Sequence, residues 1–409
     1  MSSRQRVFIT GCGAVSPLGV GVPSFWRGLV DGRCGLKPIR SFDASSYGSG
    51  LAGEVEGFES ERHLSARDCE RLDRASQYTL VAAREALLDA GLDLGARDRG
   101  RIGAIVGTSL GAMELGEAYV RGRLSGSAAE ARRMLHLPYY ALAVDLAREL
   151  DLGGPVVSPS IACASGTQAV GQAVELIRRG QADAFLVGGA EALCEFVVSG
   201  FHCLRATAAE RARPFDARRD GLSLGEGAAI LILESEAHAR DRGTRAVVEV
   251  AGSGLAGDAV HMTAPARDGA GAARAMHAAL EDAEVEPAEV DFVSAHGTGT
   301  VYNDAMEMAA LESVFGEAAS RVPLNSIKGA IGHTLAAAGS FEAILCVKVL
   351  LEGIVPPTAG CEELDPRCSL DVVRGAPRRV NAMTVLSTSS AFAGNNAAIV
   401  LRRHGEEHG

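Results

Sequence analysis

Apolar residues along the chain fall into two alternating patterns. Short runs of strand length, such as residues 102–107 and 227–233, alternate with stretches in which apolar residues recur at helical spacing, such as residues 80–93. This alternation is typical of strands connected by crossing helices. The pattern therefore predicts an α/β protein built on a largely parallel sheet.

The second half of the chain repeats the first. Five pairs of similar segments occur in the same order: 7–13 with 248–254, 80–93 with 273–286, 102–112 with 290–300, 160–180 with 326–353, and 227–233 with 396–401. Any one pair would be weak, but the shared order indicates two duplicated halves, residues 1–243 and 244–409. The first half is longer, so residues 15–80 and 113–155 are predicted to hold insertions that supply caps and interfaces.

Composition favours a folded enzyme. The 409 residues are 47% hydrophobic, and 49 glycines beside 5% aromatic residues indicate tight backbone packing. No apolar run reaches the roughly 18–20 residues of a membrane helix, and a strand pattern follows Arg6 directly, so we expect a soluble, cytoplasmic protein. Nine cysteines without a CxxC pair predict neither a disulfide framework nor a zinc knuckle. A net charge of −11 argues against nucleic-acid binding.

Cys163 is the candidate nucleophile. It follows the strand-like residues 155–162 and precedes a helical pattern over residues 167–177. A helix N-terminus favours a thiolate over a thiol and can hold an oxyanion. A cysteine considered alone is more often an inert, buried hydrophobic residue. The interpretation therefore depends on other residues.

Two histidines supply that support. His296 ends the strand-like residues 290–295, and His333 lies in the segment that matches the Cys163 segment in the repeat. If the halves pack about a pseudo-dyad, both loops meet at Cys163. Two imidazoles beside a thiol suit an enolate formed at a thioester, because their Nε2 atoms can donate to its oxygen. Alone, His333 would more often be a satisfied core histidine. Neither an HxxxH pair nor a carboxylate cluster accompanies them, so no metal site is predicted.

Several motifs together resemble one known family. They are Ala-Cys-Ala-Ser-Gly at 162–166, Pro-Phe-Asp-Ala-Arg-Arg-Asp-Gly at 214–221, His-Gly-Thr-Gly-Thr at 296–300, Asn-Ser-Ile-Lys at 325–328, Gly-His at 332–333 and Phe392. The chain resembles the elongating 3-oxoacyl-[acyl-carrier-protein] synthases of the thiolase-like superfamily over essentially its whole length.

The resemblance implies a five-layered αβαβα fold, a dimer and a ping-pong reaction. An acyl group would move to Cys163, malonyl-carrier protein would lose carbon dioxide, and a Claisen condensation would give 3-oxoacyl-carrier protein. His296 and His333 would activate the malonyl thioester. Lys328 would support His333 and the charge balance, and Glu342 would order the site from behind.

The same resemblance implies further roles. The amides of Cys163 and Phe392 would form the oxyanion hole, and Phe392 would gate the acyl pocket. Thr298 and Thr300 would bind the phosphopantetheine arm, which arrives on the acyl carrier protein, so no cofactor of the enzyme's own is expected. Leu110 and Phe201 would line the acyl pocket.

Two kinds of alternative remain: a different activity on the same fold, and a protein without enzymatic activity. An initiating synthase would carry asparagine in place of the second histidine, and a chain-length factor would lack Cys163. A thiolase would need a second cysteine in a loop near the C-terminus, and the last cysteine here, Cys368, lies outside any such loop. In a non-enzymatic binding protein the same residues would merely pack. We expect a homodimer or a heterodimer with a chain-length factor, in fatty-acid or polyketide elongation.

Two features depart from the family's usual pattern. The glycine-rich gate reads Ala391-Phe-Ala-Gly394, and alanine tolerates positive φ poorly, so a stiffer gate is expected. Leu222 replaces a phenylalanine that is common in the family, and residues 188–202 resemble synthases that build aryl-polyene and other highly reduced polyketides.

Arginines suggest where an acidic carrier protein could dock. Arg62, Arg67 and Arg71 cluster in the first insertion, and Arg205 lies near Arg211 and Arg213. Charge runs are more often solvated faces. Docking on one of the clusters is the hypothesis.

Overall fold

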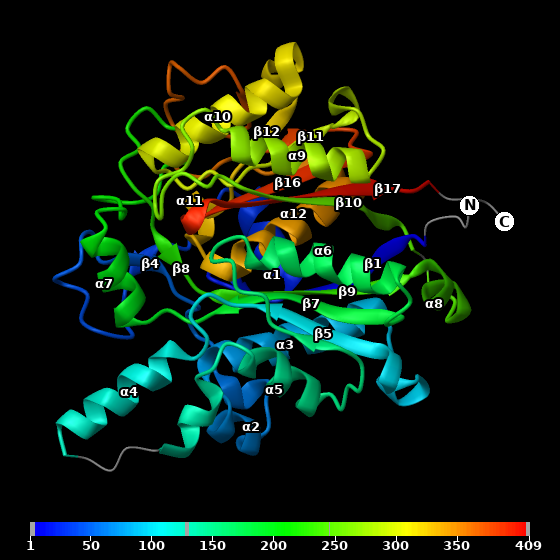
Figure 1. Cartoon of the computed structure of the whole chain (residues 1–409). Helices are drawn as coiled ribbons and strands as arrows, with labels where there is room; N and C mark the ends of the chain where they lie inside the picture. The colour runs from blue at the N-terminus through cyan, green and yellow to red at the C-terminus, as the bar shows by residue number, and fades with distance from the viewer. Residues whose placement is uncertain (1–4, 127–130, 245, 406–409) are drawn as a thin grey trace.

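The computed structural model describes residues 5–126, 131–244 and 246–405. Three of its layers are helical and contain α3 (Arg74–Ala90), α5 (Ala141–Glu149), α6 (Ser165–Arg178), α9 (Ala270–Asp282), α10 (Val301–Phe315) and α12 (Ala338–Glu352). In Figure 1, α9 and α10 cover one sheet, α6 and α12 lie between the sheets, and α3 and α5 cover the other. This is the five-layered αβαβα fold that the resemblance implied.

The strands of the two sheets form one connected path. The first half contributes β1 (Val7–Ser16), β5 (Ile102–Gly107), β6 (Val156–Val157), β7 (Ala184–Glu191) and β9 (Gly227–Ser235). The second half contributes β10 (Val248–Gly257), β11 (Phe292–Ser294), β12 (Pro323–Asn325), β14 (Asp371–Val372), β16 (Thr384–Ala391) and β17 (Asn395–Arg403). Their order is β14-β12-β11-β16-β17-β10-β1-β9-β7-β5-β6, and the short β2 (Gly19–Val20) pairs with β1.

This order shows the predicted duplication directly. Reading outward from the β10–β1 junction, β10 corresponds to β1, β17 to β9, β16 to β7 and β11 to β5. The junction itself is only two residue pairs long, Phe8 with Glu249 and Ile9 with Val248. The two sheets therefore meet at a corner rather than along a shared ladder.

The prediction of a largely parallel sheet is wrong, because the sheet is mixed. β5 runs parallel to β6 and β7, but β9 runs antiparallel to both β1 and β7. In the second half, β17 is likewise antiparallel to β10 and β16. β9 is buried along its whole length, so its unbroken apolar run looks like that of a buried parallel strand and carries no information on direction.

Glycines on the central strands let the outer helices pack closely. A Cβ at Gly13 of β1 would lie 1.9 Å from the carbonyl oxygen of Ala82 in α3, and one at Gly254 of β10 would lie 2.2 Å from that of Ala275 in α9. The two contacts occupy corresponding places in the two halves. The tight backbone packing expected from the glycine content is confirmed here.

The central helices α6 and α12 converge at their N-termini. A Cβ at Gly166 would lie 2.6 Å from the carbonyl oxygen of Ala336, and one at Gly339 would lie 2.0 Å from Thr167 Oγ1. Only glycine permits this approach, which brings together the segments that precede the two helices.

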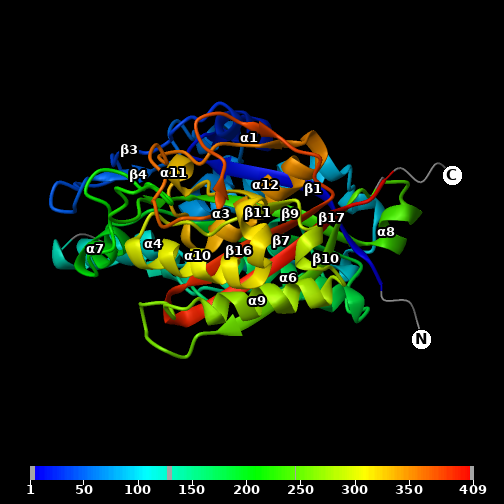
Figure 2. The same ribbon diagram turned by 90° about the horizontal axis from the view of Figure 1, so that it is seen from above.

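The predicted insertions lie where the first half is longer. Between β1 and α3 the chain forms α1 (Val22–Val30), β3 (Lys37–Pro38), β4 (Leu51–Gly53) and α2 (Ala66–Arg71), and between β5 and α5 it forms α4 (Met113–Leu124). The remaining α-helices and strands are α7 (Glu195–Cys203), β8 (Leu224–Gly225), α8 (Glu236–Asp241), α11 (Lys328–Ile331), β13 (Ile354–Val355) and β15 (Arg378–Arg379). Figures 1 and 2 both place α4 and α7 at one end of the molecule and α8 at the other. No helix within the described residues is long and apolar enough to cross a membrane.

Replacing Gly339 by alanine is expected to lower the free energy of unfolding by about 1–3 kcal/mol, because the new Cβ would clash with Thr167 and force the helices apart. Urea unfolding followed by circular dichroism measures this. Gly200→Ala is the control. It lies in α7 with open space around its Cβ, so its effect should be neutral or stabilising by up to about 1 kcal/mol. Equal destabilisation by both changes would contradict the close approach.

Candidate active site

Cys163 lies in the strand-to-helix turn that the sequence predicted. The turn is held by Ser165, whose hydroxyl accepts the Ile161 amide and donates to the Ala162 carbonyl at 2.6 Å. Ala162 has φ +53°, a left-handed conformation that alanine adopts only at a cost. The turn aims Cys163 into a pocket of about 310 Å³.

Eight of the predicted site residues line this one pocket: Cys163, Phe201, Arg205, His296, Thr298, Thr300, His333 and Phe392. They come from both halves of the chain. Lys328 and Glu342 are buried outside the pocket lining. The pseudo-dyad argument, which required the His333 and Cys163 loops to meet, is confirmed.

The helix N-terminus was expected to favour a thiolate at Cys163, but burial outweighs that effect. Burial raises the pKa of the Cys163 thiol to about 12, although the Lys328 charge and the backbone amides of Phe392 and Cys163 itself oppose the shift. The helix N-terminus could be inferred from the sequence, but the depth of burial could not. The free enzyme therefore holds a protonated thiol, with two amides directed at its sulfur.

The two imidazole rings are neutral and perpendicular. Their centroids are 5.2 Å apart at an interplanar angle of 85°. Burial, followed by the nearby Lys328 charge, holds the pKa of both His296 and His333 well below the usual histidine range. The Leu335 amide donates to His333 Nδ1 at 3.2 Å, so the proton of His333 lies on Nε2. His333 is therefore a fixed Nε2–H donor.

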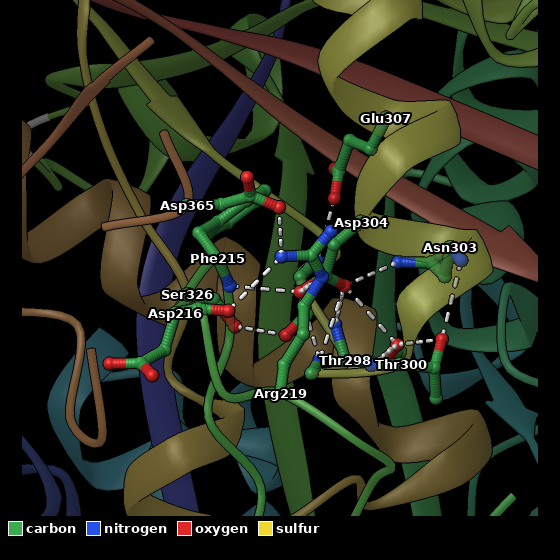
Figure 3. Close-up of polar contacts among 12 residues, drawn as sticks. Phe215, Asp216, Arg219, Thr298, Thr300, Asn303, Asp304, Glu307, Ser326 and Asp365 are labelled. Atoms are coloured by element: carbon green, nitrogen blue, oxygen red, sulfur yellow. Dashed lines mark hydrogen bonds and ion pairs between the residues drawn. The ribbon is translucent and has the colours of Figure 1, made fainter. Parts of the chain in front are cut away.

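Two buried carboxylates, Glu307 and Asp304, bind the backbone of the loop at residues 296–299. The amides of His296 and Gly297 donate to Glu307 of α10 at 2.6 and 2.7 Å, and the amides of Thr298 and Gly299 donate to Asp304. Figure 3 shows both carboxylates together with Thr298 and Thr300 of this loop. These donors are backbone amides, so the two carboxylates fix the path of the loop's main chain.

Asp304 also joins the loop to the 214–221 motif. It accepts the Phe215 amide at 2.9 Å, and Arg219 Nε lies 3.9 Å from it. Arg219 in turn donates to Asp365 at 2.5 Å (Figure 3). Thr298 and Thr300, whose hydroxyls are 3.0 Å apart, are thereby presented to the pocket on a braced loop.

Lys328 and Glu342 form a buried ion pair behind the pocket. Both side chains are at most 1% exposed, and Lys328 Nζ donates to Glu342 Oε1. Removing either partner of such a pair would leave an isolated buried charge. The pair keeps a positive charge near Cys163 and His333, as their pKa shifts show.

Sequence reasoning missed Glu191, at the end of β7. It is 1% exposed and accepts the Ser109 amide at 2.5 Å, the Thr108 hydroxyl at 3.2 Å and the Ala336 amide. Burial raises its pKa to about 7. It ties the turn that carries Leu110 to the segment that follows His333. A carboxylate that ends an otherwise apolar strand was the available signal.

The gate departs from the expectation in one of its two alanines. Ala391 has φ −133°, an ordinary extended conformation, whereas Ala393 has φ +65° and donates its amide to the Met262 carbonyl. Phe392 stacks on Phe201, with ring centroids 5.5 Å apart. Only Ala393 therefore occupies a conformation that favours glycine.

The remaining predicted residues lie around the site or away from it. Leu110 packs with Cys163 in an apolar cluster but does not line the pocket. Arg205 is exposed at the pocket and also has a left-handed backbone. Arg71 of α2 is bound by Asp145 and Glu149, so its charge is already engaged.

The structure gives little support for carrier-protein docking at Arg62, Arg67 and Arg71. Arg62 pairs with Glu59, and α2 lies in the layer opposite α10 (Figure 1). A role for Arg62 and Arg67 in docking stays a prediction. Among the described residues, no group of three or more histidine, cysteine, aspartate or glutamate side chains is arranged to hold a metal ion.

The chain matches two family descriptions. Residues 4–239 match the beta-ketoacyl synthase N-terminal domain, and residues 247–362 match the beta-ketoacyl synthase C-terminal domain.

Individual relatives agree over nearly the full length. The chain is 38% identical to 3-oxoacyl-[acyl-carrier-protein] synthase 2 of Staphylococcus aureus strain COL, over 98% of this chain and 99% of that protein. It is 39% identical to a putative polyketide beta-ketoacyl synthase 1 of Streptomyces halstedii, over 97% and 98%. Among solved structures, the ishigamide ketosynthase/chain length factor is 39% identical and superposes with a TM-score of 0.93, covering 98% of this chain and 100% of the other.

Acid is expected to destabilise the protein through the two site histidines. Their folded pKa values lie below the unfolded value of about 6.5, so below that pH the unfolded chain binds protons that the folded chain does not. Each histidine then removes up to about 1.4 kcal/mol of stability per pH unit. Urea unfolding between pH 7 and 5 should show that the free energy of unfolding falls less steeply with pH for His333→Asn than for the wild type. Exposed His277→Asn is the control, and a wild-type slope in His333→Asn would refute the neutral imidazole.

Proposed function

Because the chain belongs to the beta-ketoacyl synthase family and has the condensing activity of that family, we propose that Cys163 carries the acyl group while His296 and His333 activate malonyl-carrier protein. One observation supports this division above the others. Cys163 and two neutral imidazoles, one of them with its proton fixed on Nε2, line the same pocket.

Acyl transfer begins at the Cys163 sulfur. The sulfur attacks the carbonyl carbon of the incoming thioester, and the phosphopantetheine thiolate leaves with the proton that the cysteine loses. The amides of Cys163 and Phe392 are close enough to the sulfur to receive the oxyanion. The exchange is proton-neutral, which suits a nucleophile that starts as a thiol.

Decarboxylation then uses the imidazoles as hydrogen-bond donors. The malonyl thioester oxygen would accept from the Nε2–H groups of His296 and His333, which stabilise the enolate as carbon dioxide leaves. A protonated imidazolium is not required, and the lowered pKa values disfavour it. Thr298 and Thr300 would hold the phosphopantetheine arm along the pocket wall.

Arg205 is the arginine we assign to carrier-protein docking. It lines the pocket beside Leu204 and Asp220 and is exposed. Arg211 and Arg213, which the sequence grouped with it, are paired with Glu362 and Glu210. An acidic carrier would therefore meet the exposed positive charge of Arg205 at the pocket mouth.

Incubation with an acyl-carrier protein followed by intact mass spectrometry is expected to show an acyl adduct on the wild type and none on Cys163→Ala. His333→Ala should still acquire the adduct but lose most decarboxylation of malonyl-carrier protein, by about 10²-fold or more, because it removes an enolate donor. Released carbon dioxide measures the second step. Equal loss of both half-reactions in His333→Ala would refute this division of roles.

A heterodimer with a chain-length factor is the second candidate, and a solved structure of a ketosynthase/chain length factor with a TM-score of 0.93 favours it. The stretch of sequence from α4 to β6 holds several large exposed apolar side chains: Val120, Leu124, Leu135, Tyr139, Tyr140, Val144 and Val156. β6 is also the edge strand of the sheet. Exposed apolar edges of this kind are typical of subunit interfaces.

Light scattering of the purified chain, alone and co-expressed with a synthase-like subunit that lacks a nucleophilic cysteine, tests the pairing. Leu124→Glu is expected to shift the assembly toward monomer, because it places a charge in the proposed interface. Leu88→Glu is the matched control, since Leu88 is 83% exposed, as Leu124 is at 84%, but lies on α3. A wild-type chain that stays monomeric both alone and with the co-expressed subunit would overturn the dimer proposal.

A further inference from the structure

Under the proposed function, on which this inference rests, the condensation leaves a proton deficit at Cys163. The broken bond between the malonyl carbon and its carboxylate supplies the electron pair of the new carbon–carbon bond. The electron pair of the broken acyl–sulfur bond returns to Cys163 as a thiolate. Because burial raises the pKa of this thiol to about 12, one proton must enter for each turnover.

Neither imidazole is linked to a proton source through its second nitrogen. His333 Nδ1 accepts the Leu335 amide, which cannot pass a proton onward. His296 Nδ1 is buried and has no hydrogen-bond partner within the described part of the chain. Both rings can donate a proton from Nε2, but neither can receive a replacement proton through Nδ1.

The Lys328–Glu342 ion pair, in contrast, is hydrogen-bonded to further hydroxyl groups. Glu342 Oε2 accepts the Ser389 hydroxyl at 3.4 Å, and Ser389 Oγ lies 2.8 Å from Thr167 Oγ1. Ser389 and Thr167 are each 1% exposed. Hydroxyls donate and accept at once, so these groups form a continuous hydrogen-bonded chain from the ion pair.

This chain ends at a second cavity. Thr167 lines a groove of about 380 Å³ between α6 and β10, with the polar residues Gln168, Gln172 and Ser253 beside it. The groove shares no lining residue with the substrate pocket. These polar side chains can hold water at the Thr167 end of the groove, which a relay needs at its outer end.

We propose that Thr167, Ser389 and Glu342 relay protons from this groove to Lys328, and that Lys328 returns the proton that the Cys163 thiolate needs after each condensation. The substrate pocket holds the phosphopantetheine arm during that step. A separate route lets the proton enter while the pocket is occupied. Returning the proton also stops the thiolate from attacking the new 3-oxoacyl product.

A single-turnover experiment with acyl-loaded enzyme and malonyl-carrier protein tests the relay. A pH-indicator dye in weak buffer follows proton uptake by stopped flow before the released carbon dioxide hydrates, and quenched samples follow the 3-oxoacyl product. In the wild type, uptake of one proton should keep pace with product. In Ser389→Ala and Thr167→Val, uptake should lag behind product by about tenfold or more, because a positioned proton donor is lost.

The acyl-transfer half-reaction separates a relay from a structural role. It carries its own proton, so its rate should stay at the wild-type value in both variants. Ser387→Ala is the matched control: it lies on the same strand, and its buried hydroxyl has no partner among the described residues. It should show wild-type proton uptake.

Three results would overturn the relay. Uptake in step with product in both variants would show that the proton enters elsewhere, and equal loss of acyl transfer and condensation would show that the hydroxyls only support the fold. The same lag in Ser387→Ala would show that the effect is not specific to the chain. A wild type that forms no product would instead overturn the proposed function.

Discussion

The close approach of α6 and α12 is the constraint on which the site depends. Gly166 and Gly339 occupy corresponding places in the two halves, and a Cβ at either would collide with the opposite helix. Their convergence brings the turn before α6, with Cys163, to the segment before α12, with His333. Duplication thus supplied a symmetric frame, and the two halves then diverged at the point of contact, one toward a nucleophile and the other toward a donor.

Low dielectric surroundings set the protonation states at that contact. Desolvation keeps the thiol protonated and both imidazoles neutral, and it also raises the pKa of Glu191 and Glu307 to about 7. These two carboxylates have mainly amides and hydroxyls as partners, and each braces a loop of the site. The site therefore relies mainly on neutral hydrogen bonding, with the buried ion pairs of Lys328 with Glu342 and of Arg219 with Asp365 behind it.

Motif residues at strand ends could be predicted from sequence, whereas contacts between distant elements could not. Cys163 and His296 stand out because each follows a strand-like run, and His333 stands out because its segment matches the Cys163 segment in the repeat. Ser389 of β16 matters only because its hydroxyl meets that of Thr167 of α6, and the ion pairs of Arg71 depend on α5. The direction of β9 and the burial of Cys163 depend on packing, which apolar patterning does not encode.

The position of β1 in the sheet has a consequence for how the chain is made. This strand is synthesised before every other strand of the sheet, yet it lies near the centre of the connected sheet, and its neighbours β9 and β10 begin only at residues 227 and 248. At ordinary synthesis rates of about 5–20 residues per second, β1 stays without them for roughly 10–40 s. An apolar segment exposed that long is a natural client for chaperones, so the duplicated architecture that assembles the site also delays the burial of its first strand.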